Sequence, residues 1–169
     1  MCIKAKRLIL RHWRDSDAKS LYLCARNPNI GPIAGWAPHE SEEYSLNIIR
    51  TILCRPEAYA VFKDDILVGS VELLIHPNGN HWWGEGSAEL GYWISEEYWG
   101  KGYGTEVSKR LIKRAFNDLE VKRIYATYKN ENVASKRVLE KLGFKYYSEL
   151  YNIDYLGRPY HEIAVVLEK

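Results

Sequence analysis

The sequence predicts an α+β fold in which a largely antiparallel β-sheet carries helices on its faces. The chain has 169 residues, of which 46% are hydrophobic and 27% are charged, as is typical of a globular protein with one core. Segments with the two-residue alternation of strands are mixed with segments of helical periodicity. Pairs of strand-like segments joined by short polar turns occur toward both ends, which favours antiparallel pairing. We therefore expect one domain over residues 1–169.

The amino-terminal part predicts one strand followed by two helices. Residues 7–11, Arg-Leu-Ile-Leu-Arg, have the composition of a strand. Asp15 offers an N-cap for a helix that ends before Pro28, and residues 29–40 are expected to form a loop. Ser41 offers the N-cap of a second helix. The spacing of its apolar residues predicts a buried stripe of Leu46, Ile49, Ile52 and Leu53.

An antiparallel hairpin is expected next. The segments 58–63 and 66–76 alternate or contain β-branched residues, and Asp64-Asp65 separates them. A polar loop at residues 77–86 then contains Trp82 and Trp83. Two neighbouring tryptophans are costly to leave in water, so they either cover the core edge, which we favour slightly, or contact a ligand.

The middle of the chain predicts a strand, a glycine loop and a helix. Residues 88–94 alternate as a strand does, and Gly100, Gly102 and Gly104 then occupy every second position. A helix follows, because the next apolar residues share one helical face: Val107, Leu111, Ile112, Ala115, Phe116 and Leu119.

A glycine loop at the start of a helix predicts an anion site. Its backbone N–H groups lack intrahelical partners, the helix dipole favours negative charge, and glycine permits close approach. The dinucleotide fingerprint is absent, because Gly102 is followed by Gly104 and Thr105 instead of a glycine three residues later. The nucleoside-triphosphate loop is absent as well. The loop therefore binds phosphate groups of another ligand, or it is a connection that binds nothing.

The carboxy-terminal part predicts a strand, a helix and a hairpin. Residues 123–128 form the strand, Asn132 caps the helix, and Gly143 occupies the left-handed position at its end. Residues 144–151 and 160–167 form the two strands of the hairpin. The helix is expected to turn four side chains inward: Ala134, Val138, Leu139 and Leu142.

Composition gives no support to several other classes of protein. The formal charge of +2 gives no reason to expect a nucleic-acid partner. Three scattered cysteines favour reduced thiols, and five isolated histidines offer no metal site. No segment resembles a signal peptide or a membrane span, so we expect a cytoplasmic location and no membrane partner.

Several of these motifs, in their joint order and spacing, resemble the GNAT superfamily of acyl-CoA-dependent N-acetyltransferases. Residues 7–11 and Gly35-Trp36 are further similar to the RimJ/RimL-like branch, which acetylates the amino termini of ribosomal proteins. The resemblance covers nearly the whole chain. It implies about seven strands splayed at the sheet centre, about four helices, and acetyl-CoA as cosubstrate. The motifs that carry it are the strand 88–94, the loop 98–106 and the runs 131–135 and 140–144.

The resemblance also implies the positions that contact coenzyme A. Strand backbone near Trp93 and Ile94 would lie at the thioester and supply an oxyanion donor, and Ser135 is expected beside the pantetheine arm. Asn132 is expected there too, although its role as an N-cap already explains it. The pyrophosphate would bind the loop residues Trp99, Gly100, Lys101, Gly102, Tyr103, Gly104 and Thr105.

Two departures from the family pattern stand out. Trp99 occupies the position where the family commonly has Gln or Arg, but backbone amides provide most of the binding. Leu139 occupies the position where many members have a tyrosine that protonates the leaving thiolate. Ser135, one helical turn earlier, offers a hydroxyl for that role, or it bonds the local backbone instead.

The reaction needs a base for the amine and an oxyanion donor, and it gains from an acid for the thiolate. Glu89, in the central strand beside the expected cleft, is our predicted base. Glu72 is the rival, because a carboxylate among apolar strand residues needs a partner or a purpose. Trp36, His39, Glu72 and Trp83 are the predicted substrate contacts.

The acceptor remains open between two classes. A protein N-terminus suits the branch resemblance, whereas a polyamine or aminoglycoside would need a pocket of carboxylates such as Glu40, Glu42, Glu43 and Glu85. A third hypothesis is an idle acetyl-CoA-binding regulator, and a nucleic-acid module is a distant fourth. Both a monomer and a homodimer are compatible with the sequence.

Overall fold

The computed structural model describes residues 2–169 and contains one open sheet of eight strands with five α-helices. The strands are β1 (Cys2–Lys4), β2 (Ile9–His12), β3 (Ala58–Lys63), β4 (Ile66–Ile75), β5 (Ser87–Ile94), β6 (Arg123–Lys129), β7 (Lys145–Ile153) and β8 (Pro159–Glu168). The helices are α1 (Ala18–Ala25), α2 (Gly31–Ala34), α3 (Glu42–Thr51), α4 (Tyr103–Asp118) and α5 (Val133–Lys141). Two short 3₁₀ turns, η1 (Asp15–Asp17) and η2 (Glu96–Tyr98), precede α1 and the glycine loop.

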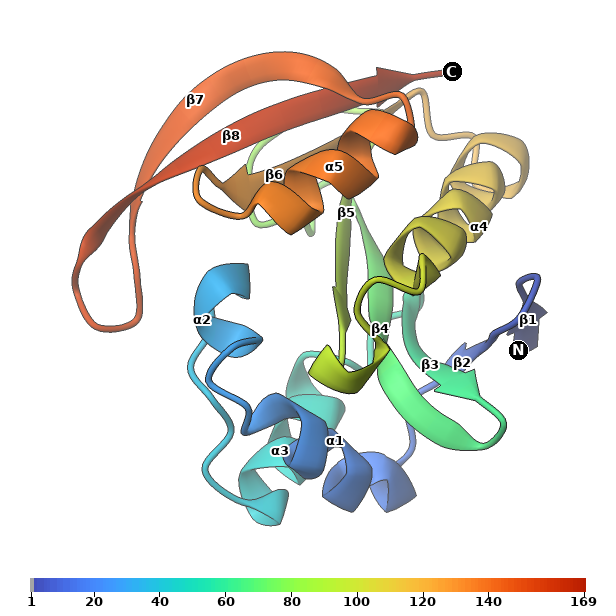
Figure 1. Cartoon of the computed structure of the whole chain (residues 1–169). Coiled ribbons are helices and arrows are strands. Elements are labelled where there is room, and N and C mark those ends of the chain that lie inside the picture. The colour runs from blue at the N-terminus through green and yellow to red at the C-terminus, as the bar shows by residue number, and fades with distance from the viewer. Residues whose placement is uncertain (1) are drawn as a thin grey trace.

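The sheet is antiparallel except at one central pair. The strand order is β1-β2-β3-β4-β5-β6-β8-β7, and the β5–β6 pair is parallel. Figure 1 shows β7 and β8 as a long hairpin that extends past β6 on the side where α2 lies. The expected α+β class is therefore confirmed.

The central pair separates along its length. β5 and β6 share three register pairs, at Ser87–Arg123, Ala88–Ile124 and Glu89–Tyr125. Beyond Glu89, β5 continues to pair with β4 as far as Ile94, and β6 continues to pair with β8. In this described part of the chain, the edges of β5 and β6 that face each other beyond these pairs are free of strand partners. The splayed centre is thus confirmed.

Two apolar clusters cover the two faces of the sheet. The larger packs α4 and α5 on one face through Val107, Leu111 and Leu139, which are at most 1% exposed. The smaller packs α1 and α3 on the other face through residues such as Leu21 and Ile49. Burial of these stripes stabilises each helix far more than its intrinsic propensity does.

Local signals placed most of the elements. Ser41 accepts a hydrogen bond from Tyr44 N (3.0 Å), and Asn132 accepts one from Ser135 N (3.0 Å), as their predicted cap roles require. Gly143 has φ of +89°, which is the left-handed helix end expected there. The hairpin turn at Asp64-Asp65 is also present, with positive φ at both residues.

Five expectations about elements and burial were wrong. Asp15 does not cap α1, because it lies inside the preceding 3₁₀ turn η1. β1 and α2 were missed, because three or four residues are too few to show a period; α2 lies in the expected loop 29–40. Ile52 is 41% exposed because α3 ends at Thr51, so Ile52 no longer lies on the helical face. Ala134 is also exposed, because the first turn of α5 faces a cavity instead of the core.

Candidate active site

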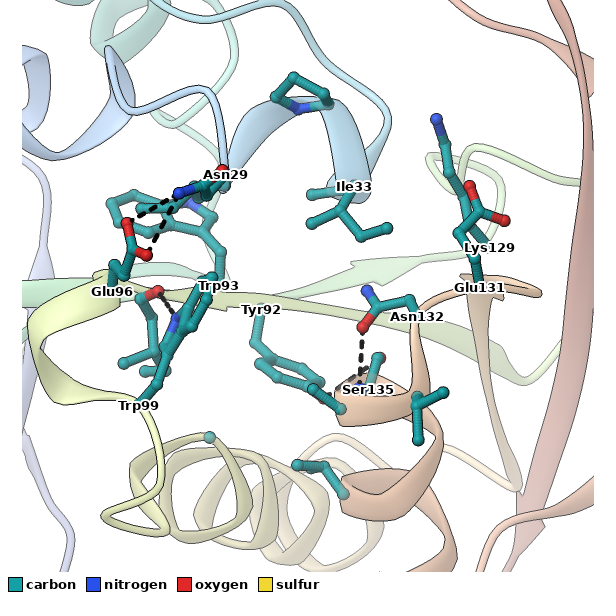
Figure 2. A pocket seen from close by; sticks show the side chains of 18 of the residues that line it. Asn29, Ile33, Tyr92, Trp93, Glu96, Trp99, Lys129, Glu131, Asn132 and Ser135 are labelled. Carbon is teal, nitrogen blue, oxygen red and sulfur yellow. Dashed lines mark hydrogen bonds between the residues drawn. The ribbon is translucent and has the colours of Figure 1, made fainter.

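A cleft of about 800 Å³ lies at the point where β5 and β6 separate. Its walls come from the end of β5, the start of α4, the start of α5 and the short helix α2. Figure 2 shows Tyr92 of β5 and Ser135 of α5 pointing toward each other in this space, with Asn132 beside Ser135. The missed helix α2 contributes Ile33, so part of the wall had no signal in the sequence.

The glycine loop presents bare backbone N–H groups at one end of the cleft. Gly100 and Gly102 have φ of +73° and +77°, a left-handed conformation that side-chain-bearing residues rarely adopt. In the described chain, none of the N–H groups of residues 100–105 donates a hydrogen bond to protein. The arrangement suits an anion at the start of α4. Of the loop residues, Trp99, Gly102, Gly104 and Thr105 line the cleft itself.

Arg7 holds this loop in place from the other end of the chain. Its Nη2 donates to Lys101 O (3.0 Å), and its Nε pairs with Glu106 Oε2 (2.7 Å) in the first turn of α4. Its guanidinium also lies over the Tyr103 ring, 4.9 Å from the centroid. The segment between β1 and β2 therefore fixes the conformation of the loop.

The outer wall of the cleft is held by polar contacts. Glu96 accepts hydrogen bonds from Asn27 (2.6 Å) and Asn29 (3.1 Å), and so connects the α1–α2 segment to η2. Trp99 Nε1 donates to Ile94 O (2.7 Å), which places the indole at the end of β5. Trp99, where the family commonly has Gln or Arg, therefore supports the cleft wall.

A second cavity of about 550 Å³ adjoins the cleft. Its walls come from β4, β5, β6, β8 and the Pro77–Gly86 loop, and Trp36 and Arg55 also line it. The residues that line both cavities mark where the two spaces meet: Ile33, Ala34, Tyr92, Trp93, Lys129, Asn132 and Ser135. A ligand in the cleft and a molecule in the second cavity would therefore meet beside Ser135.

Glu89 lies in the second cavity, and both of its carboxylate oxygens accept hydrogen bonds. Its Oε2 accepts from Asn80 N (3.0 Å), His81 N (3.2 Å) and Trp83 Nε1 (2.9 Å), and its Oε1 accepts from Asn80 Nδ2 (3.0 Å). Although burial opposes ionisation, these hydrogen bonds lower the pKa of Glu89. The carboxylate is held as an anion and fixes the preceding loop.

Glu72 shows the opposite environment. It pairs with Gly91 in the sheet register, and a Cβ at Gly91 would lie 3.2 Å from its Oε1. Its Oε2 is buried and accepts no hydrogen bond from residues 2–169, and Arg55 Nη1 is 3.9 Å away. Burial raises the pKa of Glu72. This carboxyl group is therefore the more basic of the two.

A third carboxylate and a histidine complete the wall. Glu162 on β8 accepts from Asn152 Nδ2 (2.6 Å), and His81 lies between Glu89 and Glu162, with N–O distances of 3.4 and 3.7 Å. The hydrogen bond to Glu89 raises the pKa of His81. Sequence reasoning missed Glu162 and Lys129, because strand pairing far along the chain brings them to the site.

The other predicted substrate contacts, Trp36, Trp83 and His39, do not lie together in one site. Trp36 lines the second cavity and packs edge-on against Trp93, 6.2 Å between ring centroids. Trp83 stacks on Tyr125 (4.4 Å) and supports Glu89, whereas its neighbour Trp82 is 77% exposed. His39 is 8% exposed, bonds Ser45 Oγ through Nδ1 (2.8 Å) and is not among the cavity-lining residues of the described chain.

The described residues offer a site for coenzyme A and none for a metal. Free N–H groups fit a pyrophosphate, the unpaired edge of β5 fits the amides of a pantetheine arm, and hydroxyl groups lie where the two cavities meet. No group of three metal-ligating side chains occurs in residues 2–169. No helix among them has the length and apolar character needed to cross a membrane. Fold and site together define a coenzyme A-dependent acyltransferase.

The chain belongs to the GNAT acetyltransferase family, whose domain description matches residues 7–145. It is 30% identical over 161 residues to the "Uncharacterized N-acetyltransferase YoaA" of Bacillus subtilis, covering 94% of this chain and 91% of that protein. It is 23% identical to the "Ribosomal-protein-serine acetyltransferase" of Escherichia coli, covering 88% and 85% of the two chains. Among solved structures, the RimL ribosomal L7/L12 α-N-protein acetyltransferase in complex with coenzyme A superposes with a TM-score of 0.82 at 18% identity, over 99% and 98% of the chains.

The protein is therefore an acetyl-CoA-dependent N-acetyltransferase of the GNAT type. This confirms the predicted enzyme class and the predicted cosubstrate. The structure has eight strands and five α-helices where about seven and about four were expected, because β1 and α2 are additional short elements.

Proposed function

We propose that this enzyme acetylates the α-amine of a protein or peptide N-terminus, with a glutamate on the wall of the second cavity as general base. The observation that carries the proposal is the second cavity, which opens into the coenzyme cleft beside Ser135 and has carboxylates on its wall. A chain end with its ammonium group toward these carboxylates would bring its nitrogen to the junction of the two cavities. The same proposal places the reaction in the cytoplasm, where acetyl-CoA and ribosomes are found.

The acidity of the acceptor favours an α-amine over an alkyl amine. An α-ammonium has a pKa near 8, whereas a lysine or polyamine ammonium has one above 10. Removing the proton from the alkyl ammonium is therefore harder by roughly two to three pKa units, about 100- to 1000-fold in the equilibrium. A carboxylate is a weak base, so it serves the more acidic ammonium far better.

The contacts favour Glu72 over Glu89 as this base. All the donors around Glu89 stabilise its ionised form, which leaves little free basicity. The Oε2 of Glu72 has no protein donor among the described residues, and burial raises the pKa of the group. In our proposal Glu72 accepts the amine proton, and Glu89 holds the loop that forms the wall.

The reaction also needs a donor to the oxyanion and a hydrogen-bond donor to the leaving sulfur. The end of β5 and Ser135 would supply them. The free edge of β5 at Trp93 and Ile94 would offer a backbone N–H to the developing oxyanion. Ser135, in the first turn of α5, would donate its hydroxyl to the leaving sulfur. Bound acetyl-CoA would supply the activated acetyl group. The β5 backbone N–H and the Ser135 hydroxyl would position its thioester and stabilise the charge that develops there.

The relatives support the peptide acceptor. The E. coli protein is named for acetylation of a ribosomal protein, and RimL for α-N acetylation of L7/L12. A small cationic amine is the second candidate, because Glu72, Glu89 and Glu162 share one cavity. The acids that the sequence suggested for such a pocket (Glu40, Glu42, Glu43 and Glu85) are not among its lining residues in the described chain.

A panel of acceptors tests the proposal. Thiol release from acetyl-CoA would be measured with peptides of varied first residue, the same peptides with a blocked N-terminus and an internal lysine, and polyamines. We expect turnover on free N-termini that disappears on blocking. Turnover on polyamines alone would transfer the function to the second candidate. Coenzyme binding without turnover on any amine would favour the regulator.

Substitution of the two glutamates tests the assignment of the base. Glu72→Gln is expected to lower kcat/KM for the acceptor by roughly 10²- to 10⁴-fold and to remove the acidic limb of its pH profile. That limb should lie above the ordinary carboxyl range, because the pKa of Glu72 is raised. Glu140→Gln, at an exposed position of α5, is the matched control. If Glu89→Gln abolishes the limb while Glu72→Gln keeps it, Glu89 is the base.

A further inference from the structure

Two hydroxyl groups from different layers of the molecule meet where the cavities join. Tyr92 comes from β5 and Ser135 from the first turn of α5, and their side-chain oxygens lie 3.2 Å apart (Figure 2). Both residues line the coenzyme cleft and the acceptor cavity. Because the acetyl group must pass from one cavity to the other, this pair lies beside the path of transfer.

The surrounding structure fixes the position of both groups. A Cβ added at Gly104 would lie 3.0 Å from Cε2 of Tyr92, so the last glycine of the loop leaves space for this ring. On the other side, Ser135 N donates to Asn132 Oδ1 (3.0 Å), which anchors the first turn of α5. The Tyr92 ring is therefore held between α4 and α5 with its hydroxyl directed at Ser135.

We infer that Tyr92 is a positioning residue for Ser135: its phenol O–H donates to Ser135 Oγ, so that the Ser135 O–H is directed to the sulfur of coenzyme A. Without this partner, a serine in a first helical turn commonly bonds local backbone. Leu139, one helical turn after Ser135 on α5, has no hydroxyl and is 1% exposed. The β5 tyrosine thus supports from the sheet what the helix does not supply.

The relative acidity of the Tyr92 phenol and the coenzyme A thiol decides whether the hydroxyl pair transfers a proton to the sulfur or only donates a hydrogen bond to it. During transfer the amine nitrogen bonds to the acetyl carbon, the C–S bond breaks, and its electron pair stays on sulfur. Burial raises the pKa of Tyr92 to about 12, whereas a thiol has a pKa near 8.5. Proton transfer from the phenol to the thiolate is therefore uphill. The hydroxyls keep their protons and stabilise the anionic sulfur by hydrogen bonding. Glu72 takes one proton of the ammonium, and the second passes to the solvent as the amide forms. Coenzyme A leaves as the thiolate and takes up its proton from the buffered solvent after release.

The test measures the pKa of the coenzyme A thiol in the bound state, through the ultraviolet absorbance of the thiolate during a pH titration. In the unaltered enzyme we expect this pKa to be lower than that of free coenzyme A. Tyr92→Phe and Ser135→Ala should each raise it, by at least about 10-fold in the acid dissociation constant. The double variant should raise it no further than Ser135→Ala, because both hydroxyls act through one contact.

Turnover and ligand controls separate positioning from packing. Tyr92→Phe should lower kcat roughly 10- to 100-fold with little change in KM for acetyl-CoA. The affinity for desulfo-coenzyme A, which lacks the sulfur, should stay unchanged in all variants. Tyr146→Phe, at an exposed position of β7, is the matched control.

Two results would overturn the inference. An unchanged thiol pKa in Tyr92→Phe would show that the contact does not reach the sulfur. A loss of desulfo-coenzyme A affinity in this variant would show that Tyr92 only shapes the cleft. The inference rests on the role proposed for Ser135 and not on the identity of the acceptor. If the enzyme is inactive on every peptide but the thiol pKa shifts as expected, the proposed acceptor is wrong and the inference about Tyr92 is still supported.

Discussion

At the scale of single residues, the environment of each acidic or basic group decides its role. Glu72 and Glu89 both occupy strands among apolar neighbours, and from the sequence Glu89 was the predicted base with Glu72 as its rival, the reverse of the choice that we now propose. The distinction comes from Asn80, His81 and Trp83, whose donors reach Glu89 but not Glu72. A choice that depends on how an irregular loop folds back onto a strand has no signal in the periodicity of either.

His39 makes the free energy of unfolding depend on pH. Burial lowers its pKa from 6.5 to about 4, so the fold favours the neutral ring. The unfolded chain takes up the proton as pH falls through 6.5, and the stability contribution is therefore complete above that pH and lost progressively toward about pH 4. With allowance for solvent near the ring, we expect a loss of about 1–2 kcal/mol.

Urea unfolding at neutral and acidic pH measures this contribution. In His39→Asn, which keeps a polar partner for Ser45, the free energy of unfolding should depend less on pH over that interval. Equal slopes for His39→Asn and the unaltered chain would contradict the assignment.

At the scale of elements, the parts with a sustained period and a cap could be predicted from the sequence. α3, α4 and α5 combine an apolar stripe with a recognisable start, and β3 and β4 have a clear turn between them. The short elements β1 and α2 lacked both signals.

The same limit applies to the site. The glycine loop, Asn132 and Ser135 are local motifs and were visible in the sequence. Tyr92 was visible only as part of an alternating strand, and Lys129 and Glu162 as ordinary strand residues. Their placement depends on which strands are neighbours in the sheet, and the order β5-β6-β8 is a tertiary property.

At the scale of the whole molecule, the sheet consists of two parts joined at a narrow point. β1 to β5 form one part and β6 to β8 the other, and they share the three register pairs at the start of β5. The coenzyme cleft lies between them, so a ligand there would contact both. Coenzyme binding should therefore hold the two parts together.

Thermal unfolding and hydrogen exchange test this expectation. Coenzyme A at 100 times its Kd adds about 2.7 kcal/mol of stability, which corresponds to roughly 5–10 °C in Tm for a chain of this size. Amide protection should rise along residues 90–94 of β5 as well as in the glycine loop. Adenosine 3′,5′-bisphosphate, which lacks the pantetheine arm, should protect the loop alone. Equal protection of β5 by both ligands would contradict the placement of the arm.

The contact of Arg7 with the glycine loop has a practical consequence for handling the protein. Because Arg7 bonds Lys101 and Glu106, the first few residues of the chain help to form the coenzyme site almost a hundred positions later. Removal of the segment that carries Arg7 would therefore alter that site, although Arg7 lies outside every catalytic motif.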